Sequence, residues 1–379
     1  MAQPSPVLCS HHKTGPCSSG GTPRVIAPLA PSRNRRVVLC QRPGLGGGSL
    51  KESFRTEDCE DTPIVIDDGH ILVKTLYLSV DPYMRICMNA DTGTEYLQTW
   101  KLGQTVSGGG VGVVMESKSE EFTRGDIVSK DFNWPWQLYA SLPASQTNKI
   151  DTSFGTRGLS LALGALGMPG LTSLIGIWER ADIKADSNQT FVVSAAAGAC
   201  GSLAGQIAKL EGCGRVVGIC GSDRKCRFLA DELGFDGTIN YKTEDVAARL
   251  RHCCPAGIDI YFDNVGGSIS DEVIRQMNTD GRVIPCGQIS QYSKAIGCPL
   301  DNSIREMLKR KRISREIFAC NEYTDLYDKA KRQLVAWVKE GKLKTRETVV
   351  RGLDNCGTAF EGMMNGSNIG KQVVHIADP

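Results

Sequence analysis

Short apolar runs alternate with amphipathic stretches through the middle of the chain. Five apolar runs, each a predicted strand, recur roughly every 20–24 residues, at 191–194, 215–220, 237–240, 258–263 and 281–285. The stretches between them predict helices at 202–210, 223–233, 243–251 and 268–277. A strand and a helix repeating at this period predict parallel strands with right-handed crossovers and helices on both faces. The pattern therefore predicts a doubly wound α/β domain.

The flanking regions have a different pattern. Apolar runs at 36–40 and 71–78, a glycine-rich turn at 43–48 and Gly/Asp-punctuated segments up to about residue 158 predict a mainly β domain. The C-terminal part predicts a helix over 325–340 and a last strand over 370–376. We expect a β domain at 36–158, the α/β domain at 159–334, and a segment at 335–379 that rejoins the β domain.

The start of the chain lacks any such pattern. The first 36 residues hold no Asp or Glu but five Lys or Arg and six Pro. Without periodic apolar residues, residues 1–35 are expected to be a disordered extension. A mitochondrial transit peptide is the alternative, because such peptides are rich in Arg and poor in acid. The prolines and the lack of an amphipathic helix argue against it.

Composition narrows the class of protein. A length of 379 residues suits two domains, and a net charge of +2 gives no reason to expect a nucleic-acid or membrane-surface partner. No apolar run approaches the length that spans a bilayer, so membrane insertion is not expected. The fifteen cysteines are scattered and odd in number, which is typical of a reducing compartment and predicts a cytoplasmic protein. The oligomeric state stays open between monomer and homodimer.

The first candidate site is a glycine-rich turn at 195–201, directly after the first predicted strand of the α/β domain. Small residues let backbone N–H groups approach a pyrophosphate, and the start of the following helix faces its charge. In this strand–turn–helix context the motif predicts a Rossmann dinucleotide site that includes Gly198, Ala199, Cys200 and Gly201. The alternative is a tight structural turn without a ligand.

The end of the second strand indicates which cofactor is bound. NAD sites usually carry an acid here for the ribose 2′-hydroxyl, but residues 220–222 read Cys-Gly-Ser. Lys225 could attract a 2′-phosphate and Tyr241 could add a hydrogen bond, which together favour NADPH. The alternative is that Lys225 is an ordinary solvated lysine.

No residue pattern predicts a metal site. Outside the leading segment the histidines are His70, His252 and His375, none in a zinc-ligand context, and adjacent Cys253 and Cys254 are a poor ligand pair. We therefore expect no metal in the reaction.

Two polar turns follow the fourth and fifth strands. Ligands of open α/β sheets bind beyond the carboxyl ends of strands, so the loop 286–292 is expected to border the nicotinamide. Asn264, after the fourth strand, is placed for a contact on the same side. The alternative is that both are simple polar turns.

With these residues assembled, the chain resembles the prostaglandin reductase branch of the zinc-free medium-chain dehydrogenases/reductases. The resemblance rests on seven stretches, 76–85, 133–137, 164–172, 195–201, 261–267, 286–292 and 366–371, and covers residues 36–379. It implies a Rossmann doubly wound parallel sheet plus a GroES-like, mainly β catalytic domain, with NADPH between them.

The resemblance also implies which residues form the site. Cofactor contacts fall on Gly198, Ala199, Cys200, Gly201, Lys225, Tyr241, Asn264, Cys286, Gly287, Gln288, Ile289, Ser290, Gln291, Tyr292, Phe318, Ala319, Cys320 and Asn368. Substrate contacts fall on Phe132, Asn133, Ala319, Cys320 and Asn321, and Tyr292 matches the active-site tyrosine. Three features depart from the family: Asn133 stands where an aromatic is expected, the 293–300 loop is short and lacks the expected proline-rich run, and the leading extension has no counterpart.

The implied reaction is reduction of the carbon–carbon double bond of an α,β-unsaturated ketone, most specifically a 15-keto-prostaglandin. Hydride transfer to the β carbon develops an enolate, which a metal-free site must stabilise with preorganised donors. Tyr292 and the nicotinamide ribose hydroxyl are the expected donors. Three alternatives remain: a quinone reductase, a general enone or enal reductase on the same scaffold, and a non-enzymatic NADPH-binding protein.

Overall fold

The computed structural model describes residues 33–44, 48–59, 65–93, 97–185, 187–294 and 300–379. Residues 1–32 of the expected extension lie outside these ranges. Its last three residues, 33–35, are described, and here the expected boundary is wrong because the chain is already folded. Asn34 is buried, and its amide donates to the Tyr139 carbonyl at 3.0 Å. Arg35 begins the first strand. The folded part therefore includes residues that we had assigned to the extension.

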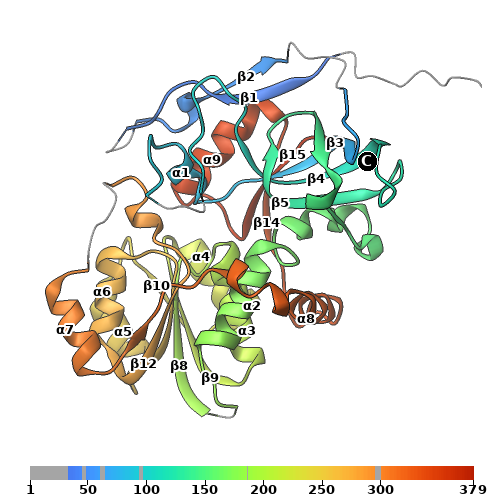
Figure 1. The fold of residues 1–379 in the computed structure, drawn as a ribbon. Coiled ribbons are helices and arrows are strands. Elements are labelled where there is room, and N and C mark those ends of the chain that lie inside the picture. Colours follow the sequence, from blue (N-terminus) through green and yellow to red (C-terminus); the bar gives the residue numbers. More distant parts are fainter. Residues whose placement is uncertain (1–32, 45–47, 60–64, 94–96, 186, 295–299) are drawn as a thin grey trace, which may run out of the picture. The chain divides into compact units, whose positions relative to one another are not determined.

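The central domain is built on a six-stranded parallel sheet (Figure 1). Its strands are β8 (Ser187–Ser194), β9 (Cys213–Cys220), β10 (Gly237–Asn240), β11 (Ile258–Asp263), β12 (Met277–Pro285) and β13 (Ser314–Arg315). They lie in the order β10-β9-β8-β11-β12-β13. This is the Rossmann order, and it reverses direction between β8 and β11. The predicted doubly wound fold and its five strands are confirmed; only the two-residue β13 was not predicted.

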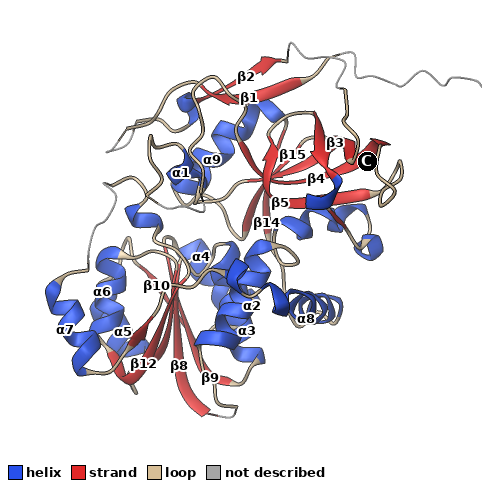
Figure 2. Cartoon of the chain, viewed as in Figure 1, coloured by secondary structure: helices blue, strands red, loops and turns tan. Residues whose placement is uncertain are grey.

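Helices cover both faces of this sheet (Figure 2). They are α2 (Met168–Arg180), α3 (Ala199–Leu210), α4 (Asp223–Arg227), α5 (Val246–Cys253), α6 (Gly267–Arg275), α7 (Asn302–Arg310) and α8 (Tyr327–Lys339). Strand β8 shows why two layers form: Phe191 and Val193 pack with α2, α3 and α8, whereas Val192 packs with α5, α6 and α7. The predicted helix over 223–233 is wrong in detail, because α4 passes into a π-helical turn at Phe228–Glu232.

The other domain is mainly β. A seven-stranded sheet contains β3 (His70–Ser79), β4 (Ser107–Ser117), β5 (Ile127–Pro135), β6 (Tyr139–Pro143), β7 (Asn148–Lys149), β14 (Glu347–Arg351) and β15 (Lys371–His375). A separate pair is formed by β1 (Arg35–Leu39) and β2 (Phe54–Asp58), and two helices, α1 (Met84–Cys87) and α9 (Cys356–Met364), accompany them. Short 3-10 turns lie at Lys51–Ser53, Ala144–Gln146, Thr152–Phe154, Thr156–Leu163, Ile289–Gln291, Cys320–Glu322, Thr324–Leu326 and Leu353–Asn355.

The C-terminal segment joins the two domains. The expected boundary at 334/335 falls inside α8, and Leu343 still packs into the core of the parallel sheet. The chain then enters the seven-stranded sheet, where β15 lies between β14 and β3. Just before β15, Gly370 pairs with Gly198 of the glycine-rich turn. This segment therefore brings residues 366–372 to the end of the parallel sheet that carries the glycine-rich turn.

None of the helices in the described ranges is both long enough and apolar enough to cross a membrane.

Candidate functional site

The glycine-rich turn links β8 to the start of α3. Ala195 adopts a left-handed backbone conformation (φ 47°), and its carbonyl accepts a hydrogen bond from the Gly198 N–H at 2.9 Å. A side chain at Gly201 would bring its Cβ within 2.4 Å of that carbonyl oxygen. Only glycine therefore fits at 201, and the first N–H groups of α3 stay accessible to an anion.

A cleft of about 1090 Å³ opens at this turn and is lined by residues of both domains. All predicted site residues except Gln288 and Gln291 line it. From the parallel-sheet domain and the C-terminal segment these are Gly198, Ala199, Cys200, Gly201, Lys225, Tyr241, Asn264, Cys286, Gly287, Ile289, Ser290, Tyr292, Phe318, Ala319, Cys320, Asn321 and Asn368, joined by Phe132 and Asn133 from the β domain. The structure thus brings together residues separated by more than 200 positions.

The two glutamines pack on a neighbouring turn instead. A Cβ at Gly266 would lie 3.2 Å from the Gln288 side chain, and a Cβ at Gly267 would lie 2.6 Å from Gln291 Nε2. Both glycines have positive φ angles, which let the turn after β11 pass this close beneath the glutamines. Gln288 and Gln291 therefore hold the loop in place rather than face the cleft.

Two cations and a phenol gather at the end of β9. Lys225 donates to the Gly366 carbonyl at 2.8 Å, and burial, together with nearby Lys242, lowers the pKa of its ammonium. The Tyr241 ring lies against Gly221, and Lys242 also lines the cleft, although sequence reasoning missed it. Two acids close by are engaged by Asn240: Asp223 accepts from its side-chain amide and Glu244 from its backbone N–H, each at 2.7 Å. This end of the cleft is therefore suited to an anion.

The point where the strand order reverses is held by a buried carboxylate. Asp263 is fully buried and accepts hydrogen bonds from the hydroxyls of Ser194, Tyr261 and Ser270. Asn264 follows it, and its amide donates to the Ser194 carbonyl at 2.8 Å. The predicted residue Asn264 thus also links β8 to β11 at the floor of the cleft.

Tyr292 is positioned by its own loop. The Gln288 backbone N–H donates to the Tyr292 hydroxyl oxygen at 3.1 Å, and a Cβ at Gly287 would lie 3.0 Å from that oxygen. Ser290 fastens the same loop by donating to the Val265 carbonyl at 2.7 Å. Of the shortened 293–300 loop, residues 295–299 lie outside the described ranges.

The β-domain wall of the cleft is aromatic. Phe132 is 41% exposed, and its ring lies 5.5 Å from that of Tyr83, another cleft residue that sequence reasoning missed. Burial, and secondarily Asp81, raise the pKa of the Tyr83 phenol well above its usual value. Asn133 has φ 59°, a conformation that Asn adopts more readily than an aromatic residue. The backbone of β5 therefore gives a physical reason for the unexpected asparagine.

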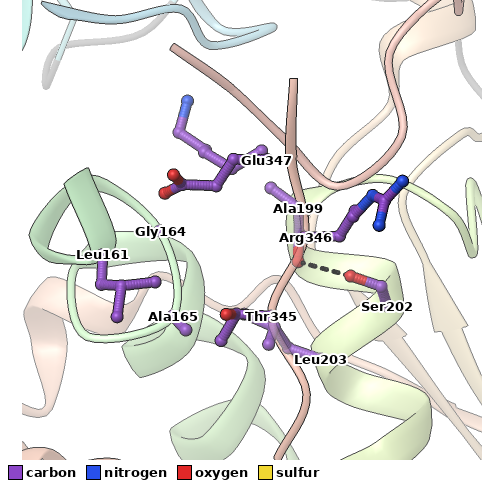
Figure 3. Close-up of a pocket in the computed structure, with 10 residues that line it drawn as sticks. Leu161, Gly164, Ala165, Ala199, Ser202, Leu203, Thr345, Arg346 and Glu347 are labelled. Atoms are coloured by element: carbon purple, nitrogen blue, oxygen red, sulfur yellow. Dashed lines mark hydrogen bonds between the residues drawn. The ribbon is translucent and has the colours of Figure 1, made fainter. Parts of the chain in front are cut away.

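A buried ion pair lies at the junction of the two domains. Lys371, 3% exposed, lies 3.0 Å from Asp81 and donates to the carbonyls of Val80 and Gln372. Beside it, a void of about 10 Å³ separates α3 from the segment that enters β14 (Figure 3). Ala199 and Ser202 line this void on the side of α3, and Thr345 and Glu347 line it on the side of the segment that enters β14. A lysine at the start of an apolar strand was the signal that could have found this pair in the sequence.

Three cysteines that line the cleft, Cys200, Cys286 and Cys320, lie near one another. Contact with the Cys200 thiol, and then burial, raise the pKa of Cys286 well above its usual value, and Cys320 lies nearby. Within the described ranges, no three His, Cys, Asp or Glu side chains are grouped so that they could hold a metal ion.

Comparisons with known proteins identify similar oxidoreductases, including one solved with NADPH. Residues 35–150 match a family described as the N-terminal domain of oxidoreductase, and residues 199–332 match one described as zinc-binding dehydrogenase. The chain is 40% identical over 330 residues to mouse prostaglandin reductase 1, which covers 85% of this chain and 93% of that protein. It is 36% identical to the NADPH-dependent curcumin reductase of Escherichia coli, covering 91% and 97%. The crystal structure of CurA from Vibrio vulnificus with NADPH superposes with a TM-score of 0.82 at 37% identity, covering 91% and 100%.

Proposed function

Because the chain belongs to the medium-chain dehydrogenase/reductase superfamily of oxidoreductases, we propose that it reduces the carbon–carbon double bond of α,β-unsaturated ketones with NADPH. One observation carries the proposal: a single cleft combines a dinucleotide-binding turn, a cationic end and an aromatic wall, with Tyr292 among its lining residues.

The residues of this chain fit NADPH. Gly201 leaves space where any side chain would collide with the turn, so a pyrophosphate can approach the start of α3. Lys225, Lys242 and Tyr241 offer charge and hydrogen bonds to a 2′-phosphate. Of the described residues, neither Asp223 nor Glu244 lines the cleft, and both accept hydrogen bonds from Asn240. When bound, NADPH supplies the hydride.

The protein's own contribution is to stabilise negative charge on the substrate carbonyl oxygen as the enolate forms. Tyr292 is the proposed donor, since it lines the cleft and the Gln288 N–H fixes the position of its hydroxyl oxygen. The enolate carbon is then protonated from solvent. No step in this scheme requires a metal ion.

The β-domain wall of the cleft supports a proposal for the substrate class. Tyr83, Phe132, Ile86, Leu97 and Trp100 line the β-domain side and suit a long apolar chain. We therefore propose 15-keto-prostaglandins as substrates, the activity of prostaglandin reductase 2, to which the sequence motifs are similar. Curcumin-like enones and quinones are the competing substrates on the same scaffold.

A panel of substrates tests this proposal. NADPH oxidation would be followed by its absorbance with a 15-keto-prostaglandin, a short-chain enone, curcumin and a quinone. We expect the highest kcat/KM with the 15-keto-prostaglandin. A preference for the quinone would assign the chain to quinone reduction, and NADPH binding without turnover of any substrate would contradict the enzymatic proposal.

Replacing Lys225 with alanine is expected to weaken NADPH binding by about tenfold or more, because one charge-assisted hydrogen bond contributes roughly 1.5–3 kcal/mol. NADH, which lacks the 2′-phosphate, should bind the variant and the wild-type protein equally well. Fluorescence titration with both cofactors measures the difference. Arg224→Ala, which removes an exposed cation one residue away, is the matched control and should leave both affinities unchanged. Equal loss for NADPH and NADH would contradict the role of Lys225.

A further inference from the structure

Two cysteines meet beside the cationic end of the cleft. Cys220 ends β9 and Cys226 lies in α4, and their sulfur atoms are 3.4 Å apart. Cys220 is 2% exposed, whereas Cys226 is half-buried. Neither residue belongs to the predicted site, and neither has a part in the proposed reaction. The turn between them, residues 221–225, carries Lys225.

We propose that Cys220 and Cys226 form an oxidisable dithiol, which a peroxide converts to an intramolecular disulfide that weakens NADPH binding. The modification site itself rests on the separation of the two sulfurs. Its effect on the cofactor rests on the proposed function, because it requires that Lys225 and Tyr241 hold the 2′-phosphate.

The chemistry takes two steps. The more accessible Cys226 sulfur attacks hydrogen peroxide, so that an S–O bond forms, the O–O bond breaks and one water leaves. The Cys220 sulfur then attacks the sulfenic acid on Cys226, so that the S–S bond forms, the S–O bond breaks and a second water leaves. In total, two thiols lose two electrons and two protons, and one hydrogen peroxide is reduced to two waters.

The environment of each thiol favours this order. Burial, and then the neighbouring Cys226, raise the pKa of Cys220 to about 12, so that Cys220 is a poor first nucleophile. It nevertheless lies in contact with the sulfur that would be oxidised. The positive charge of Lys225 lies near Cys220 and favours its thiolate in the second step.

Closing the bond would move the turn that carries Lys225. A disulfide needs the sulfurs about 2.05 Å apart, so they must approach by about 1.4 Å within a packed core. The Ser222 hydroxyl accepts from the Lys225 N–H at 3.3 Å, and Lys225 holds the Gly366 carbonyl. Gly221 lies against the Tyr241 ring. A shift of this turn therefore displaces both proposed 2′-phosphate ligands.

The experiment uses the full chain, oxidised with hydrogen peroxide and then alkylated. Trypsin should release residues 216–224 and 226–227 as two peptides joined by a disulfide, which mass spectrometry identifies without reduction. NADPH affinity, measured by fluorescence titration, should fall about tenfold on oxidation and recover with dithiothreitol.

Two variants separate this dithiol from the other cysteines. Cys226→Ala removes a residue that does not line the cleft, and it should bind NADPH like the reduced wild-type protein and keep that affinity after peroxide. Cys254→Ala, which removes a buried thiol adjacent in sequence to Cys253, is the matched control and should respond like the wild-type protein.

Each contrary outcome overturns one defined part of the proposal: the modification site, its coupling to NADPH binding, or the proposed function. Absence of the linked peptide, while the reduced chain binds NADPH, overturns the modification site and leaves the proposed function intact. A linked peptide without loss of affinity overturns the coupling to the cofactor. Peroxide sensitivity that persists in Cys226→Ala assigns the effect to another thiol and also overturns the coupling. Failure of the reduced chain to bind NADPH overturns the proposed function, whereas the linked peptide still tests the dithiol.

Discussion

Replacing Tyr292 with phenylalanine is expected to lower kcat on a 15-keto-prostaglandin by roughly 100-fold, because removing one preorganised donor to a developing oxyanion costs about 3 kcal/mol. The affinity for NADPH should change little, since the ring and its packing against the loop remain. Steady-state kinetics give kcat, and a fluorescence titration gives the cofactor affinity of the same preparation.

A second role for the hydroxyl predicts a different pattern. The Gln288 N–H donates to this oxygen, so the hydroxyl could act only by holding the loop. In that case Tyr292→Phe would weaken NADPH binding with little loss of kcat, and the proposed donor role would be wrong. Tyr323→Phe is the matched control. Its hydroxyl accepts from Arg180 at 2.8 Å and does not line the cleft, so turnover should be unchanged.

The parallel-sheet domain could be predicted because its information is local. Each buried strand is a continuous apolar run, and each crossover helix has a helical period of apolar residues. The five strands can therefore be predicted without knowing which strands they pair with. Helix α2 was missed because it carries Pro169, Gly170 and Gly176, which read locally as a turn. In the structure, Gly170 lies beneath the Ala165 carbonyl and Gly176 beneath Phe318, contacts that the sequence alone does not reveal.

The β domain was predicted only as a class, since its strands depend on distant partners. Strand β4 contains the run Gly108, Gly109 and Gly110, which has no strand propensity but lies under Trp134 and Trp136. The register of β4 with β5 also shifts between Gly108 and Gly110, beside the stretch that holds Phe132 and Asn133. A pattern of alternating residues cannot reveal such a bulge.

The residues of the candidate site also fall into those that the sequence could assign and those that it could not. Residues after the strands of the parallel sheet could be assigned from sequence, because the carboxyl ends of its strands meet at one edge. The same rule covers Lys242, which follows β10 and was overlooked, but it could not assign Tyr83 and Lys371 to the cleft. Tyr83 and Lys371 reach it through the pairing of β3 with β15, which joins residues almost 300 positions apart.

The buried ion pair lies beside that pairing, and Lys371→Met is expected to lower the free energy of unfolding by about 3–5 kcal/mol. The substitution keeps much of the side-chain volume but removes the cation, leaving Asp81 buried with the Ser79 hydroxyl as its remaining side-chain donor among the described contacts. The carbonyls of Val80 and Gln372 each lose the lysine donor as well, although Gln372 still accepts from the Val80 N–H at 3.3 Å. Urea unfolding of both proteins measures the difference.

Two further variants show whether charge or packing causes the loss. Lys339→Met removes a partner of Asp151 in an exposed pair and should cost no more than about 1 kcal/mol. Adding Asp81→Asn to Lys371→Met should recover much of the stability, because the double variant no longer buries an unpaired carboxylate. Additive losses from the two substitutions would contradict this account, because they would show that packing rather than the ion pair stabilises the junction between β15 and the Asp81–Tyr83 wall of the cleft.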